Sequence, residues 1–143
     1  MLPLFHPALV HFSVAFLIVG AGCEAYGMLS RRERAERFGS LLLWIGAASL
    51  ILTLSSGYIA ANTVSVGPAA TEVLEAHERN GWFLLGLIVA ALFWKGWNRG
   101  KIPDGQRLFF ALLLLAVVAL TVYSALLGGQ MVYVHGVAVG GQG

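Results

Sequence analysis

The sequence predicts an all-α membrane protein, a single bundle of four transmembrane helices. Of its 143 residues, 58% are hydrophobic and only 11% are charged, whereas soluble domains carry about a quarter charged residues. The apolar residues fall into four windows, each long enough to cross the roughly 30 Å hydrocarbon core of a bilayer. Four such spans use nearly the whole chain, so we expect one domain over residues 1–143 and no soluble catalytic domain.

The first two predicted helices cover about residues 7–29 and 38–62. Pro7 suits a first helical turn, because the N–H group that proline lacks would have no partner there. No basic segment precedes the first apolar window, so we expect this helix to remain in the protein rather than to be cleaved as a secretory signal.

The third and fourth predicted helices cover about residues 76–97 and 108–133, and we place Pro68 in the loop ahead of the third helix. Gly128-Gly129 interrupts the last window. Two glycines cost a helix about 2 kcal/mol relative to alanine, which predicts a bend at this point. A glycine-rich tail at residues 136–143 is expected to be flexible.

The basic residues predict the orientation of the bundle. Eight of the nine basic residues lie around the first and third connections, namely Arg31, Arg32, Arg34, Arg37, Lys95, Arg99, Lys101 and Arg107. Short loops rich in lysine and arginine stay in the cytoplasm. We therefore expect both termini and the Thr63–Glu75 connection on the non-cytoplasmic side of a multi-pass protein.

All four histidines are predicted to lie at that outer face. Counted from the basic connections at about 1.5 Å per residue, His11 and His77 lie roughly 27–30 Å away, at the outer edge of the hydrocarbon. His6 lies just above His11. The bend predicted at Gly128-Gly129 would fold His135 back over the bundle.

Several imidazoles at a membrane edge, without a pair of thiols, favour a haem or metal site. Neutral imidazole binds iron, copper and zinc, and two imidazoles from facing helices suit a low-spin haem b. We expect one or two haem b groups, with His11 and His77 as the first ligand pair and His135 and His6 as further ligands. A zinc or copper site is the alternative, and so is simple packing of these rings at the interface with no cofactor.

Other residues near these histidines fit a macrocycle. Gly81 lies one turn below His77 and Ala15 one turn below His11, so both leave room beside a ligand. Arg79 is the lone basic residue on the outer side and is a candidate partner for a haem propionate. His6 and His11 are five residues apart, about 140° around a helix, so a regular helix cannot direct both to one metal ion.

The acidic residues allow two interpretations each. Glu24 lies near the end of the first helix, where a carboxylate suggests a proton path or else a partner of Arg31 or another basic loop residue. Glu72, Glu75 and Glu78 recur at helical spacing, as an acidic docking face or as a solvated helix face. Nothing in the sequence resembles a hydrolytic triad or a nucleic-acid surface.

Four segments together resemble a known family: His6–Phe12, Ser56–Ala61, Ala76-His77 and Gly128–Val139. They are similar to the DUF2231 family of predicted four-helix bacterial membrane proteins, over essentially the whole chain. The resemblance implies a bacterial protein, so we expect the inner membrane, and the outer face predicted from the basic residues then corresponds to the periplasmic side. Relatives joined to Rieske-type or cytochrome c-type modules imply a redox setting. Ser13 stands where the family commonly has a second proline.

Three functions are compatible with these features. The first is a membrane haem b protein that carries electrons from a donor such as quinol to a periplasmic cytochrome c or Rieske-type acceptor. The second is a histidine-based zinc or copper site. The third is a cofactor-free structural or assembly subunit of a respiratory or photosynthetic complex, or a homo-oligomer. All three favour an accessory membrane protein over a stand-alone enzyme.

Overall fold

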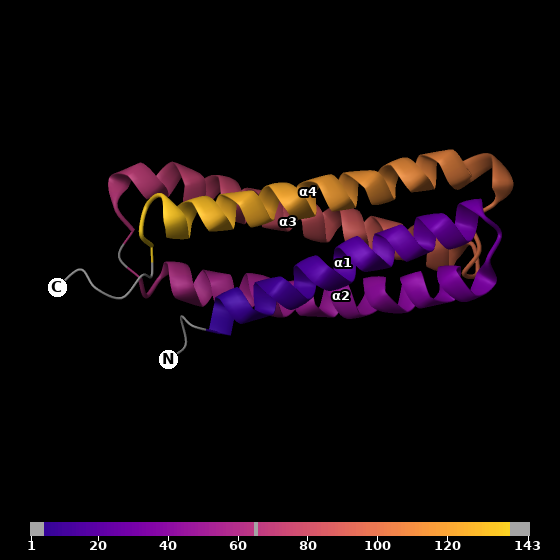
Figure 1. Cartoon of the computed structure of the whole chain (residues 1–143), viewed down its shortest axis with the longest axis horizontal. Coiled ribbons are helices and arrows are strands. Elements are labelled where there is room, and N and C mark those ends of the chain that lie inside the picture. Colours follow the sequence, from indigo (N-terminus) through magenta and orange to yellow (C-terminus); the bar gives the residue numbers. More distant parts are fainter. Residues whose placement is uncertain (1–4, 65, 138–143) are drawn as a thin grey trace.

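The chain folds into a bundle of four long α-helices (Figure 1). The computed structural model describes residues 5–64 and 66–137. Its helices, with one short 3-10 turn, are α1 (Phe5–Leu29), α2 (Glu33–Ala61), α3 (Pro68–Trp97), η2 (Asp104–Gln106) and α4 (Arg107–Tyr133). Each of the four α-helices is long and apolar enough to cross a membrane, which confirms the predicted all-α transmembrane class. Most of the predicted flexible tail, residues 138–143, lies outside the described residues.

The third helix begins earlier than the sequence predicted. It starts at Pro68 instead of near residue 76, so Pro68 is its first residue and does not lie in a loop. Gly67 precedes it in an extended conformation, with φ −69° and ψ 158°, and the fixed φ of proline suits the first helical position. His77 therefore lies in the third turn of α3, with two helical turns above it.

The predicted bend at Gly128-Gly129 is wrong. Helix α4 continues through both glycines to Tyr133, and the chain turns at Gly136, which has a φ of +62°. The N–H groups of Gly136 and Val137 donate to carbonyl groups in the last turn of the helix. Packing of α4 on α1 and α3 outweighs the low helix propensity of two glycines, because propensity is a weak preference next to tertiary contacts.

The helices occupy the corners of a square in chain order. Helix α1 packs on α2 and α4, and α3 packs on α4 and α2, while α1 and α3 lie diagonally with no direct backbone packing in the described part of the chain. Both termini and the α2–α3 connection lie at one end, here named the terminal end (Figure 1). The α1–α2 and α3–α4 connections lie at the opposite end, here named the basic end, with the eight clustered basic residues.

The bundle is built for an apolar solvent. Its core consists of aliphatic residues such as Leu17, Leu43, Ile88 and Val117. Large aromatic and aliphatic side chains also cover the outside; Phe83, for example, is 64% exposed. The interior instead holds several buried polar or charged side chains, which are Ser13, Glu24, Thr53, Asn80, Lys95 and Thr121. Polar groups turned inward and apolar groups turned outward are expected where lipid surrounds the protein.

Glycines allow α1 and α2 to approach closely along a fixed register. On α1, Gly20 lies against Leu43 and Gly27 against the backbone of Glu36. On α2, Gly39 lies against the backbone of Glu24, and Gly46 lies against the side chain of Leu17. Each glycine thus receives a larger residue from the facing helix, as in small-residue packing of membrane helices.

This register positions polar side chains at both ends of the α1–α2 interface. At the terminal end His6 lies over Gly57, and at the basic end Glu24 and Glu36 lie beside Gly39 and Gly27. The rotation of α1 about its own axis is therefore set by backbone contact, and this rotation decides which α1 side chains face the interior.

Candidate functional site

His6 points from the first turn of α1 into the bundle. A Cβ atom built on Gly57 would lie 2.9 Å from the Cε1 atom of the ring, so the imidazole rests on the bare backbone of α2. The Nδ1 atom of His6 lies 2.9 Å from Ser56 Oγ, and Ser56 Oγ donates its proton to the carbonyl of Thr53. Because the hydroxyl proton is already used, Ser56 accepts from Nδ1–H of His6. This tautomer leaves a free lone pair on Nε2.

His77 points from α3 toward α4 and is half-buried. Its Nδ1 atom lies 3.1 Å from the carbonyl oxygen of Ser124, and a Cβ atom built on Gly128 would lie 3.6 Å from its ring. A carbonyl oxygen only accepts hydrogen bonds, so Nδ1 of His77 carries the proton and Nε2 carries the lone pair. His6 and His77 both lie toward the terminal end of the bundle.

His11 lies on the exposed face of α1, away from this pair. Its Nδ1 atom is 2.6 Å from the carbonyl oxygen of Pro7, one turn earlier in the same helix. The structure therefore turns His6, and not His11, toward the interior that His77 also faces. Because the two positions are about 140° apart around the helix, only one of the two histidines can face the interior. The glycine contacts between α1 and α2 fix the rotation of α1 that turns His6 inward.

The remaining predicted site residues are dispersed around the terminal end. His135 is half-buried in the turn after α4, where its backbone N–H donates to the carbonyl of Gln130. Arg79 and Ala15 are exposed. Gly81 is buried but faces α2, since a Cβ atom there would lie 2.7 Å from the side chain of Leu54.

The histidines share one hydrogen-bonding pattern. His6, His11 and His77 each use Nδ1 for a bond to an oxygen atom. Metal-ligating histidines are typically held in this way, because the bond at one nitrogen fixes the tautomer and orients the other toward the metal. Within residues 5–64 and 66–137, no three His, Cys, Asp or Glu side chains gather as a metal-binding group. What the described bundle offers is a pair of inward imidazoles.

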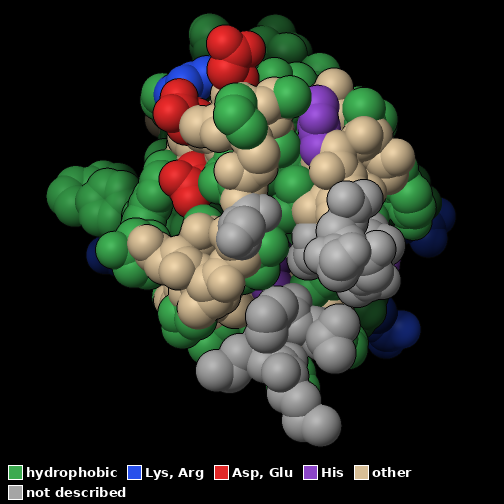
Figure 2. Space-filling view, turned by 90° about the vertical axis from the view of Figure 1, so that its left-hand side faces the viewer, with side chains coloured by type: hydrophobic (Ala, Val, Ile, Leu, Met, Phe, Trp, Pro, Cys, Tyr) green, Lys and Arg blue, Asp and Glu red, His purple; other side chains and the backbone are tan. Residues whose placement is uncertain are grey.

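An acidic patch lies on one side of the terminal end. Glu72, Glu75 and Glu78 are exposed on the first turns of α3, with Arg79 beside them. Viewed end-on, acidic side chains lie on one side of the terminal end and histidine lies on the other, among apolar groups (Figure 2). The sequence predicted that the histidines and these glutamates share one end of the bundle. It did not predict that Ser56, Gly57, Ser124 and Gly128 contact the histidines, because these contacts join segments far apart in the chain.

A second polar cluster lies at the basic end, inside the bundle. Glu24 of α1 has no exposed surface, and Lys95 of α3 is 8% exposed. The Lys95 ammonium group donates to a carboxylate oxygen of Glu24 and, at 3.1 Å, to one of Glu36 on α2. The Ser40 hydroxyl lies 2.7 Å from the other Glu24 oxygen. Three helices thus contribute to one buried charge cluster.

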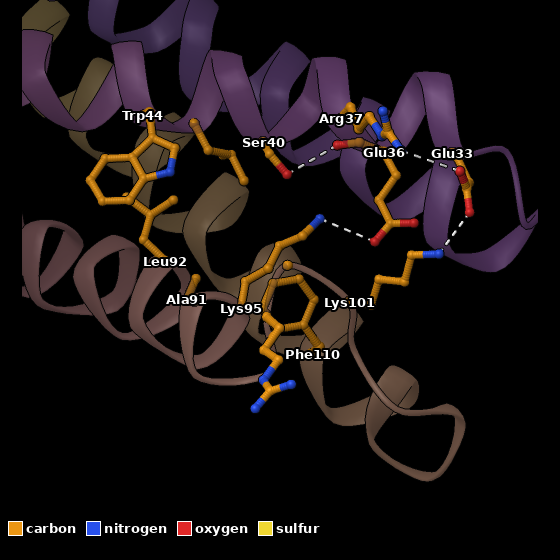
Figure 3. A pocket seen from close by; sticks show the side chains of 14 residues that line it. Glu33, Glu36, Arg37, Ser40, Trp44, Ala91, Leu92, Lys95, Lys101 and Phe110 are labelled. Atoms are coloured by element: carbon orange, nitrogen blue, oxygen red, sulfur yellow. Dashed lines mark hydrogen bonds and ion pairs between the residues drawn. The ribbon is translucent and has the colours of Figure 1, made fainter.

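A cavity of about 370 Å³ between α2 and α3 leads to this cluster. Lys95 reaches from α3 across the cavity toward Glu36, with Ser40 nearby on α2 (Figure 3). Trp44, Leu92 and Phe110 form its apolar wall. At its rim the cavity is charged, and the ion pairs there are Lys101 with Glu33 at 2.7 Å and Arg37 with Glu33 at 3.5 Å. The cluster is therefore buried by protein but has a polar route to the surface.

The sequence predicted only part of this cluster. It gave Glu24 a basic partner near the loops, and the structure confirms a basic partner. Arg31 pairs with Asp104 instead, at 3.5 Å, and the partner of Glu24 is Lys95. The charge pattern groups Lys95 with the third connection, but Lys95 is a buried residue in the last turns of α3.

The comparisons with known proteins give a family and no closer relative. A family model described as a predicted membrane protein, DUF2231, matches residues 2–141. No curated protein and no solved structure matches the chain.

Proposed function

The chain belongs to the DUF2231 family of predicted membrane proteins, and we propose that it is an electron carrier with a haem b held between His6 and His77. The observation that carries this proposal is the pair of inward imidazoles, each with Nδ1 bonded to an oxygen atom and Nε2 free. A haem bound there would be held by His6 and His77 and would supply one-electron chemistry. The rest of the site then serves to hold and surround these two rings.

Haem fits the two imidazoles better than zinc does. Two imidazoles from the protein would be enough to hold a low-spin haem b, whereas zinc sites use three or four protein ligands. The described residues bring two imidazoles inward and form no group of three ligand side chains. Both rings also lie against glycine, Gly57 for His6 and Gly128 for His77, so each imidazole rests on the bare backbone of a neighbouring helix.

The placement of the two ligands suits a group that spans the interior. The two ligands come from helices α1 and α3, which lie diagonally across the bundle and have no direct backbone packing in the described part of the chain. Ser56 and Ser124, which bond the two rings, come from the other two helices, α2 and α4. Each ligand is therefore oriented by a neighbouring helix, which supports a preorganised site.

The proposed setting is the bacterial inner membrane, with the terminal end outside. The clustering of eight basic residues at the basic end supports this orientation. The donor would be a quinol in the bilayer. Exposed Glu72, Glu75 and Glu78 suit a cationic acceptor such as a periplasmic cytochrome c, because complementary charge speeds the encounter of two proteins.

The absorbance spectrum of the purified protein, oxidised and then reduced with dithionite, tests the proposal. We expect a sharp Soret band and a reduced α band, both lost when either ligand is removed in His6→Ala or His77→Ala. His11→Ala is the matched control, because this exposed ring lies on the same helix; it should keep the haem. All three variants should insert into the membrane, because insertion depends on the apolar residues.

Two outcomes would contradict the proposal. Loss of haem in His11→Ala together with full haem in His6→Ala would restore His11 as the partner of His77. A wild-type protein without haem bands, expressed with added haem, would refute the cofactor itself. Metal analysis of the same sample would then separate a zinc or copper site from a cofactor-free assembly subunit.

A further inference from the structure

The buried cluster at the basic end has an excess negative charge that the proposed haem site does not use. Two carboxylates, Glu24 and Glu36, share the single ammonium group of Lys95, so the fully ionised cluster has a net charge of −1. An unbalanced charge is costly in a buried, low-dielectric setting. One added proton removes this imbalance.

The other charged groups around the cluster lie toward the water-exposed rim. Arg37, Arg99 and Lys101 line the cavity together with Glu33, which pairs with Arg37 and Lys101, so these four groups carry a net charge of +2. On the α4 side, Arg107 pairs with Asp104 at 2.8 Å. Charges exposed to water are screened, so they act weakly on a carboxylate with no exposed surface.

Ser40 provides hydrogen bonds for both protonation states of Glu24. Its hydroxyl oxygen lies 2.7 Å from Glu24 Oε2 and 3.1 Å from the carbonyl oxygen of Glu36. A hydroxyl has only one proton to donate. When Glu24 is ionised, Ser40 donates to it. When Glu24 is protonated, Glu24 donates to Ser40, and Ser40 donates to the Glu36 carbonyl. Neither state leaves a buried polar group without a partner, which would be costly.

We propose that Glu24 is a proton-binding site that exchanges one proton with water in the cavity between α2 and α3. Ser40 and Lys95 line this cavity, whereas Glu24 lies behind them. In the uptake step a hydronium ion in the cavity gives a proton to Ser40 Oγ, and the original Ser40 proton passes to Glu24 Oε2. Release follows the reverse path, so the number of protons balances. This inference goes beyond the proposed function and does not depend on haem.

Protonation of Glu24 would also alter how the helices are connected. Lys95–Glu24 is the one ion pair between α1 and α3 in the described part of the chain, and these helices have no direct backbone packing. A neutral Glu24 no longer attracts the ammonium group as an ion, while Glu36 on α2 continues to do so. Proton uptake thus weakens the ionic attraction between α3 and α1 and leaves the one between α3 and α2.

Infrared difference spectra of the wild-type protein between neutral and mildly acidic buffer test this inference. We expect the C=O stretching band of a protonated carboxylic acid to grow as the pH falls, and to shift to lower frequency in D₂O. The band should be absent in Glu24→Gln, which keeps the size and hydrogen bonding of the side chain. Glu75→Gln is the matched control, because this exposed residue of α3 lies at the other end; it should keep the band.

Ser40→Ala keeps the test decisive if Glu24→Gln fails to fold. Removal of the hydroxyl should shift the frequency of the band, because a protonated Glu24 loses its acceptor. The inference is overturned if no deuterium-sensitive band appears in the wild-type protein. It is also overturned if the band survives in Glu24→Gln, or disappears only in Glu36→Gln, or is unmoved in Ser40→Ala. These measurements detect a carboxylic acid and not haem absorbance, so their failure is distinct from a failure of the haem proposal.

Discussion

At the scale of single residues, hydrogen bonds separate the histidines more clearly than sequence position does. His6 is tied to a serine of α2, His77 to a backbone carbonyl of α4, and His11 only to its own helix. The first two bonds cross between helices and fix inward-facing rings. The third fixes a ring on the surface. The tautomer is the same in all three, so direction is what distinguishes a candidate ligand from a surface residue.

Gly57→Ala should disturb the haem site more than Gly128→Ala. The new Cβ at position 57 would lie 2.9 Å from His6, so the ring must move, whereas the one at position 128 would lie 3.6 Å from His77, an ordinary contact. We expect Gly57→Ala to lower the haem content several-fold, and Gly128→Ala to keep it while stabilising α4 by up to about 1 kcal/mol. Pyridine haemochrome assays of the two purified variants measure this. Equal haem content would show that the ring of His6 is not confined by α2.

The orientation of the histidines marks the limit of sequence reasoning at this scale. The spacing of His6 and His11 shows that only one of them can face a given site, and the structure respects this. Which one faces inward depends on how α1 is rotated. That rotation comes from contacts with residues on α2, such as Gly39 against Glu24 and Gly57 against His6. The local spacing of residues along α1 does not predict these contacts.

At the scale of elements, the α1–α2 pair is the best defined part of the bundle. Its four glycines, Gly20, Gly27, Gly39 and Gly46, each accept a larger residue from the facing helix. Association of helices in lipid lacks a hydrophobic driving force and depends on close packing. The pair is therefore expected to remain associated even when α3 and α4 are loosened.

Gly39→Ala should destabilise this pair strongly. Its Cβ would collide with the backbone of Glu24, which cannot move without shifting α1. Overpacking of this kind costs typically 1–3 kcal/mol, and we expect about 3 kcal/mol here because the obstacle is backbone. Gly22→Ala is the control on α1, since nothing lies within 4 Å of a Cβ at that position; it should be neutral or slightly stabilising. Unfolding by denaturing detergent measures both, and equal midpoints would refute the close approach.

The sequence predicted the existence of all four helices but misplaced some of their ends. Helix α3 is about two turns longer at its start than predicted. The prediction missed these turns because Glu72 and Glu75 lower the hydropathy of residues that are nevertheless helical. Helix α4 did not bend at Gly128-Gly129 because tertiary packing outweighs propensity. A hydropathy window detects the part of a helix that lies in lipid, and it does not detect a helical extension into water.

At the scale of the whole molecule, the two polar clusters lie at opposite ends. The four histidines lie toward the terminal end of the bundle. The Glu24–Lys95–Glu36 cluster and the eight clustered basic residues lie at the basic end. The aliphatic core separates them. The sequence predicted this polarity, because charge and helix length together determine which residues share an end. It did not predict that Lys95 is internal, since its partners lie 71 and 59 positions away.

Reporter fusions test the proposed orientation of the whole protein. A reporter active only outside the cytoplasm, fused after Gly143, should be active. The same reporter inserted among residues 31–37 should be inactive, because short loops rich in basic residues are retained in the cytoplasm. A reporter active only in the cytoplasm should give the opposite pattern at both positions. Activity of the first reporter at residues 31–37 and not after Gly143 would place the histidines inside.

Helix α3 has a role that neither cluster shows alone. It is one continuous helix that carries His77 near one end and Lys95 near the other, separated by roughly 27 Å along its axis. A change in how Lys95 is held would be transmitted along this helix to His77, the proposed iron ligand. Thermodynamic linkage is reciprocal, so a proton bound on one face of the membrane and an electron bound near the other would alter each other's affinity by the same free energy. The midpoint potential of the proposed haem near one face of the membrane would then depend on the pH at the opposite face.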